Sequence, residues 1–172
     1  ADSVSQVSWM PRPADAAAQV NIGIVHSRMG DLAAAVAAFK KAVDLGGTGG
    51  DAALKLGGLY VHQRRLRSAV QVFKAATAEH PQHAELFAAL GDVYRQLGLL
   101  SAATQAGEHA VRLEPARALW RFHLASTYER LDGDKAETEW RRYLKLATND
   151  AQEAQRLNYA HERLQHLERK GE

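Results

Sequence analysis

The sequence contains no cysteine and only four prolines, and both scarcities restrict the structures and chemistry open to the chain. Without cysteine the chain can form no disulfide, offers no thiolate nucleophile and cannot build a cysteine-based zinc or iron–sulfur site. Four prolines in 172 residues, together with abundant alanine, favour helix. Apolar residues nevertheless make up 46% of the chain. The chain can therefore bury a core, and disorder along its whole length is excluded.

Long apolar runs and a strong charge of one sign are also missing. No apolar stretch approaches the ~20 residues of a membrane span. With 22 basic and 20 acidic residues the formal net charge is only +2, and the basic run QRRLR at 63–67 has no interleaved aromatic residues. We therefore expect no nucleic-acid partner. The chain starts at Ala1 without a basic and apolar leader, so a removed leader and a piece of a longer protein both stay open, and the compartment, cytoplasmic or periplasmic, is undetermined.

The most informative feature that is present is an internal repeat. The segment LGGLY at 56–60 aligns with LGDVY at 90–94, so that a leucine, a glycine and a tyrosine each recur 34 positions apart. Each interval holds two stretches of about 14 residues in which apolar positions lie three or four apart, the pattern of a helix with one buried face. Further residues keep the same spacing: Ala35, Ala69 and Ala103, Ala42, Ala76 and Ala110, and Pro81 and Pro115.

This spacing resembles the tetratricopeptide repeat, whose pattern is W-x2-L-G-x2-Y, then A-x3-F, then P. The fourth interval departs most from the pattern, because one residue is missing before Ala136 and Trp140. The resemblance implies an all-α, right-handed α-solenoid of about four helix–turn–helix repeats with a C-terminal capping helix. The second interval carries the motif residues Ala53, Leu56, Gly57, Tyr60, Ala69, Phe73 and Pro81.

We expect the chain to be organised as a tail, a repeat array and a cap. Residues 1–15 have no helical period and are expected to be an extended tail or linker; we hypothesise that its Trp9 and Met10 dock in a groove. Residues 149–172 are expected to contain the capping helix, whose apolar stripe is formed by Leu157, Ala160, Leu164 and Leu167. Between them lie the four repeat units, 16–49, 50–83, 84–117 and 118–148.

The glycine-rich stretch DLGGTGGD at 44–51 raises the question of a phosphate-binding loop. Such a loop ends in Gly-Lys-Ser/Thr after a strand, whereas here Asp51 places a negative charge where a phosphate would sit. In the repeat register the stretch lies where later units have a helix-stopping proline, so we predict a turn. Gly30 and Gly98 are predicted to end helices in the left-handed conformation. Gly107 replaces the usual aromatic residue and leaves a space that another side chain must fill.

No pattern of residues indicates chemistry. The segment HERLQH at 161–166 places its second histidine at i+5, off the face of the first, so it does not match a zinc-protease helix. No nucleophile elbow or triad spacing is present. We therefore expect no catalytic residue, no metal site, no cofactor and no enzymatic activity.

The resemblance also implies where a partner would bind. In proteins similar to this one, the first helix of each repeat lines the concave side of the array, at fixed positions. Carried over to this sequence, these positions predict a peptide groove with an apolar strip, hydrogen-bond donors and two further residues: Val20, Ile24, Leu54 and Val61, then Arg28, His62, Arg95 and Arg130, then Asp92 and Phe122. In the alternative interpretation, an N-terminal segment or a flanking repeat covers these side chains.

One kind of ligand is excluded by the same comparison. Proteins of the family that grip a chaperone's C-terminal carboxylate do so with a set of lysines, asparagines and an arginine. The matching positions here carry Val20, Ile24, Lys55, Glu85 and Ala89. That clamp is therefore absent.

The leading interpretation is a non-catalytic scaffold or adaptor that binds a protein or peptide partner in its concave groove. Two alternatives stay open. The chain can be a self-assembling unit that forms homo-oligomers, or an accessory domain of a larger multidomain protein.

Overall fold

The computed structural model describes residues 13–46, 48–147 and 153–171, and all regular secondary structure in these ranges is helical. This confirms the predicted all-α class. The hypothesis about Trp9 and Met10 concerns residues outside the described ranges. The helices are α1 Pro13–Arg28, α2 Leu32–Leu45, α3 Asp51–His62, α4 Leu66–Glu79, α5 Ala84–Gln96, α6 Leu100–Leu113, α7 Ala118–Tyr128, α8 Gly133–Leu146 and α9 Ala154–Gly171.

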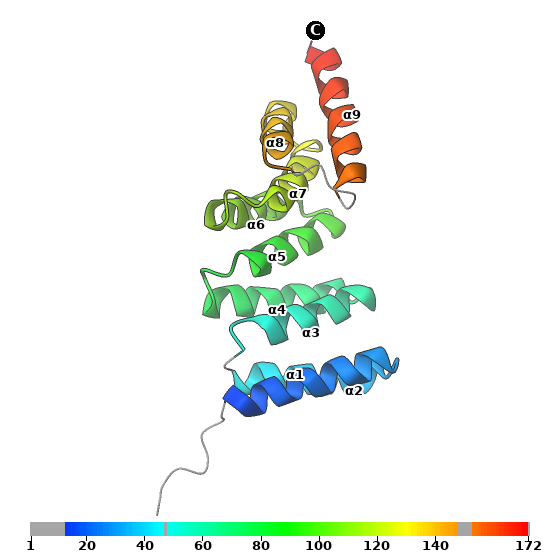
Figure 1. The fold of residues 1–172 in the computed structure, drawn as a ribbon, viewed down its shortest axis with the longest axis vertical. Helices are drawn as coiled ribbons and strands as arrows, with labels where there is room; N and C mark the ends of the chain where they lie inside the picture. The colour runs from blue at the N-terminus through cyan, green and yellow to red at the C-terminus, as the bar shows by residue number, and fades with distance from the viewer. Residues whose placement is uncertain (1–12, 47, 148–152, 172) are drawn as a thin grey trace, which may run out of the picture. The chain divides into compact units, whose positions relative to one another are not determined.

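The chain divides into two compact units, Ala1–Arg65 (unit 1) and Leu66–Glu172 (unit 2). Unit 1 contains α1 to α3, and its middle helix α2 packs against both of the others (Figure 1). Unit 2 contains α4 to α9, and each of its helices packs against the next along the chain. The boundary falls between the two helices of the second predicted repeat. The division into four repeat units remains our proposal for the organisation of the sequence.

The first helix begins earlier than predicted. α1 starts at Pro13, whereas we expected an extended segment as far as residue 15. Proline is favoured in the first turn of a helix, where its missing N–H would have no partner in any case. Asp15 also lies in the first turn, where the helix dipole favours a negative charge.

Residues with positive φ end or separate the helices. Gly30 (φ +79°) and Gly98 (φ +74°) adopt the predicted left-handed conformation. Gly46, Gly49 and Gly50 also have positive φ, which confirms that the glycine-rich stretch is a turn. Between Gly30 and Gly98 in the repeat register lies Arg64, with φ +60°. The sequence did not predict a positive φ at Arg64, because a residue with a Cβ rarely takes the left-handed conformation.

Glycine allows close helix packing inside both units. A Cβ at Gly23 of α1 would lie 2.6 Å from the ring of Phe39 on α2, and one at Gly91 of α5 would lie 3.2 Å from the carbonyl oxygen of Ala103 on α6. Gly107 has a similar role, since its Cβ would lie 3.2 Å from Leu124 Cδ1. Leu124 is therefore the side chain that fills most of the space beside Gly107, and a void of only about 10 Å³ remains there.

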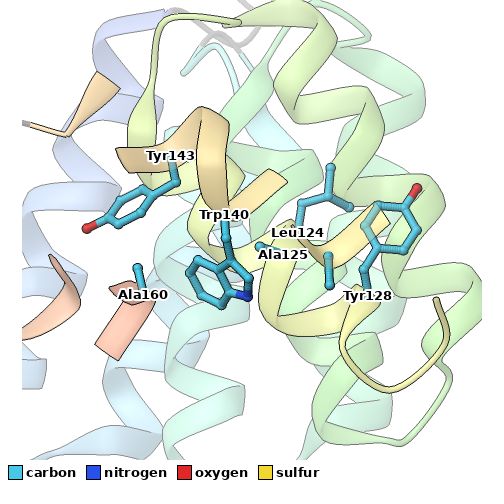
Figure 2. Close-up of a cluster of buried hydrophobic side chains, with 7 residues drawn as sticks. Leu124, Ala125, Tyr128, Trp140, Tyr143 and Ala160 are labelled. Atoms are coloured by element: carbon cyan, nitrogen blue, oxygen red, sulfur yellow. The ribbon is translucent and has the colours of Figure 1, made fainter. Parts of the chain in front are cut away.

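The core of unit 2 continues onto the last helix. Figure 2 shows the indole of Trp140 with Tyr143 and Ala160 on one side and Leu124, Ala125 and Tyr128 on the other. Ala160 of α9 is fully buried in this cluster. The remaining leucines of the predicted stripe, Leu157, Leu164 and Leu167, pack against it. The helix α9 therefore caps the apolar face of α7 and α8, as the sequence predicted.

Candidate functional site

An open cleft of about 460 Å³ lies within unit 1. It combines three of the predicted groove residues, Ile24, Arg28 and His62, with residues that the sequence did not single out as a site. Its lining comes from α1, the start and middle of α2, and α3: Ile24, Ser27, Arg28, Leu32, Phe39, Lys55, Gly58, Leu59 and His62.

Helical spacing brings these side chains to one place. On α1, Ile24 and Arg28 are four residues apart and therefore lie one above the other on the same face. On α3, the lining residues are Lys55, Gly58, Leu59 and His62, again three or four apart. No atom lies within 4 Å of the position that a Cβ on Gly58 would occupy, so the absent side chain keeps the cleft open.

The cleft has an apolar base and a cationic rim. Phe39 and Leu59 are 3% and 8% exposed and close the bottom, with Ile24 and Leu32 half-buried beside them. Arg28, Lys55 and His62 are exposed. The lining includes no aspartate or glutamate. In the part of the chain that the structure describes, no carboxylate forms an ion pair with these three side chains.

The other predicted groove residues of unit 1 lie outside this cleft. Val20, Leu54 and Val61 are half-buried on α1 and α3, and none of them contributes to the lining. The apolar base is provided instead by α2 and by Leu59 of α3. The helical periodicity of the sequence places Leu32, Phe39 and Leu59 on buried faces. It does not show that part of each side chain also lines a cleft.

In unit 2 two of the predicted polar groove residues, Asp92 and Arg95, are paired with each other. A guanidinium N–H of Arg95 donates to Asp92 Oδ1 at 3.2 Å, one turn away on α5. The second carboxylate oxygen of Asp92 lies 2.7 Å from Nδ1 of His123 on α7. Asp92 therefore links α5 to α7. Arg130, at the end of α7, is exposed.

Phe122 is half-buried and packs against other aromatic rings. Its ring lies 5.2 to 5.9 Å, between centroids, from the rings of Trp140, Tyr143 and Tyr159, and it packs against the core cluster of Figure 2. The prediction of Phe122 as a groove residue stays a prediction, for a side chain that packs partly against the core. The repeat position is the one expected, but the capping helix α9 packs over it and buries half of the side chain.

Hydrogen bonds hold α9 and its neighbours in place. Arg163 of α9 donates to both carboxylate oxygens of Glu129 at 2.9 and 3.0 Å, and Trp140 Nε1 donates to the same carboxylate at 2.8 Å. The hydrogen bond to Glu129 raises the pKa of Arg163. Burial, followed by a hydrogen bond to Glu108, raises the pKa of Tyr128 well above its usual range. Both groups keep their protons at neutral pH, and both donate hydrogen bonds to carboxylates within unit 2.

A second surface of unit 1 is apolar. Ile22, Val25 and Met29 are 43%, 55% and 74% exposed, and they lie three or four residues apart along one face of α1. Isolated exposed apolar residues are common, but a stripe along a helix is typical of a surface that packs against something. We call these three residues the outer stripe.

The described ranges lack two further features. They contain no group of three histidine, aspartate or glutamate residues able to hold a metal ion. They also contain no helix with the length and apolar character that a membrane span requires.

The stacked helix pairs and the cleft between their helices define a helical-repeat protein. Two sequence profiles of the tetratricopeptide repeat family match, one over residues 27–93 and the other over residues 84–117. The chain belongs to the tetratricopeptide repeat family. None of the curated proteins compared with the chain matches it.

Solved structures share the fold. A crystal structure of MamA is 22% identical, with a TM-score of 0.70 over 78% of this chain and 74% of MamA. The type III secretion chaperone SycD of Yersinia enterocolitica, in complex with a peptide of the translocator YopD, is 16% identical, with a TM-score of 0.67 over 71% of this chain and 94% of SycD. A tetratricopeptide repeat protein of Parabacteroides merdae is 16% identical, with a TM-score of 0.76 over 91% of this chain and 61% of that protein.

These likenesses confirm a helical-repeat solenoid. At such identities they show the fold alone. Repeats of this family generally act as protein–protein interaction modules, which present the surface of stacked helices to a partner.

Proposed function

We propose that this protein is a non-catalytic scaffold or adaptor that binds a peptide or a segment of a partner protein in a groove formed by the first helices of its repeats. The observation that carries the proposal is the cleft of unit 1, where Ile24, Arg28 and His62 come together over an apolar base. Apolar anchors beside hydrogen-bond donors suit a bound peptide. The absence of catalysis is inferred from the family.

A protein of the same fold supports this proposal. SycD is described in complex with a peptide of the translocator YopD. The volume of the cleft in unit 1, about 460 Å³, lies within the range of ~300–1,000 Å³ typical of ligand sites. A site of this size holds one or two side chains of a longer segment, so that flanking residues of the partner would extend along α1 and α3.

The test is an affinity capture from the native cell with two matched variants. Ile24 and Val25 are neighbours on α1, but Ile24 lines the cleft and Val25 faces outward. We expect Ile24→Asp to weaken capture of a partner by about 1–3 kcal/mol, because the variant removes an apolar anchor. Val25→Asp should capture the same partner as the unmodified protein.

Both variants should keep their helical circular dichroism, because neither residue lies in the core between helices. Equal capture by Ile24→Asp and the unmodified protein would exclude the cleft as the binding surface. Loss of helicity in Ile24→Asp would show instead that Ile24 belongs to the core.

Self-association is the second candidate function, and the outer stripe favours it. Ile22, Val25 and Met29 form an apolar face on the first helix of the described array, and a second copy of the chain could cover it. If so, the mass in sedimentation velocity should rise with concentration, and Val25→Asp should abolish the rise. A mass that stays constant over the concentration range would exclude this function.

A further inference from the structure

We propose that the cleft of unit 1 recognises an acidic segment, in which an apolar side chain is flanked by aspartate or glutamate. This inference rests on the proposed function and names the chemistry of the partner. It goes beyond the predicted groove of apolar anchors and hydrogen-bond donors, because Lys55 joins Arg28 and His62 in the lining and no carboxylate does.

Among the described residues, no carboxylate pairs with the basic side chains of the rim. Arg28 approaches the cleft from α1, and Lys55 and His62 approach it from α3. Elsewhere in the described chain basic residues commonly pair with carboxylates, as Arg121 does with Glu139 at 2.8 Å and Arg163 with Glu129 at 2.9 Å. Cations that face a common space without a partner attract a ligand that brings the carboxylates, through charge-assisted hydrogen bonds.

A simpler account exists for two of the three basic side chains. Arg28 and His62 lie in the last turns of α1 and α3, where a basic side chain stabilises the helix dipole. Lys55 lies in the middle of α3, so the dipole does not explain its position. Lys55 is therefore the residue on which the proposal depends most.

The apolar base of the cleft indicates that the ligand also carries an apolar side chain. A surface that attracted anions alone would need no apolar contact, yet the lining also includes the half-buried Ile24 and Leu32 and the buried Phe39 and Leu59. An apolar side chain that enters the cleft is removed from water, and its neighbours in the sequence then lie at the level of the cations. The partner segment thus places an apolar anchor next to its acidic residues.

The carboxylates are expected to come from side chains. At the positions where related proteins hold a C-terminal carboxylate, this chain has Val20, Ile24, Lys55, Glu85 and Ala89. Only Lys55 among them is a cation, so the geometry points to aspartate or glutamate within a segment rather than to a chain end.

The experiment is a selection from a random library of twelve-residue peptides with amidated C-termini, using the whole protein as bait. We expect the enriched peptides to carry aspartate or glutamate beside a large apolar residue. Their affinity, measured by fluorescence anisotropy, should fall with rising salt, because exposed charges are screened. Replacing the acidic residues of the best peptide by glutamine or asparagine should weaken binding about tenfold or more.

A second experiment reverses a charge on the protein instead of on the peptide. Lys55→Glu should weaken binding of the selected acidic peptide about tenfold or more and should favour the same peptide with lysine in place of its acidic residues. Lys40→Glu makes the same change at an exposed lysine of α2 outside the cleft, and it should leave binding unchanged. Circular dichroism checks that both variants fold; if Lys55→Glu does not, Lys55→Gln replaces it.

Several results would overturn the inference. They are enrichment of neutral or basic peptides, no enrichment, binding that Lys55→Glu leaves unchanged, or selection only when the library has free C-termini. If capture of a partner depends on Ile24 but the selected peptides lack acidic residues, the proposed function stands and this inference is rejected. If capture does not depend on Ile24 and the selected peptides also lack acidic residues, the proposed function and this inference are both rejected.

Discussion

Two positions show how the repeat structure accommodates residues that depart from its sequence pattern. Gly30, Arg64 and Gly98 occupy one slot of the repeat, and all three have positive φ. Glycine adopts this conformation at little cost, whereas arginine is strained by its Cβ. The stacked architecture holds Arg64 in place although its side chain disfavours the conformation. Gly107 shows the opposite case, in which a missing side chain is replaced by Leu124 from the next helix.

The strain at Arg64 leads to a stability prediction. Arg64→Gly should raise the free energy of unfolding by about 0.5–1 kcal/mol, because relief of the left-handed strain exceeds the entropy that glycine adds to the unfolded chain. Chemical denaturation followed by circular dichroism measures the change. Arg64→Ala is the control: it removes the same charge but keeps a Cβ, so it should bring no gain. A similar gain in both variants would attribute the effect to the charge.

At the scale of the helix, α9 determines which surfaces of unit 2 are available. Its apolar stripe covers Trp140, Tyr143 and Phe122, and Arg163 anchors it to Glu129. This packing leaves the predicted groove residue Phe122 half-buried. In unit 1, the predicted groove residues Ile24, Arg28 and His62 line an open cleft.

The burial of Ala160 allows the packing of α9 to be tested. Ala160→Asp places a carboxylate in the apolar cluster of Figure 2, where Ala160 is 0% exposed. We expect a loss of about 2–4 kcal/mol in the free energy of unfolding, with earlier tryptic cleavage within α9. Asn158→Asp adds the same charge at an exposed position of α9 and should change stability little. Equal effects of the two substitutions would contradict the packing of α9 described above.

At the scale of the whole molecule, the chain is a repeat array, and a cleft of its unit 1 is lined by Arg28 and Lys55 without a carboxylate. The family predicts a binding surface but not its partner, because the repeat motif specifies how helices pack and says little about the residues between the motif positions. The exposed positions therefore carry the information about the partner. In unit 1 we propose that these are Arg28, Lys55 and His62 around the apolar base.

The amino-acid sequence by itself determined the helical class, the register of the repeats, the glycine-rich turn and the apolar face of α9. Each follows from local spacing, since helix periodicity and turn conformation depend on residues close in the chain. Only the tertiary structure decided that Ile24, Arg28 and His62 share a cleft with Lys55, that Asp92 binds Arg95 and lies against His123, and that α9 covers Phe122. These outcomes depend on which helix packs against which. That choice is made by contacts between residues far apart in the chain, which no local pattern encodes.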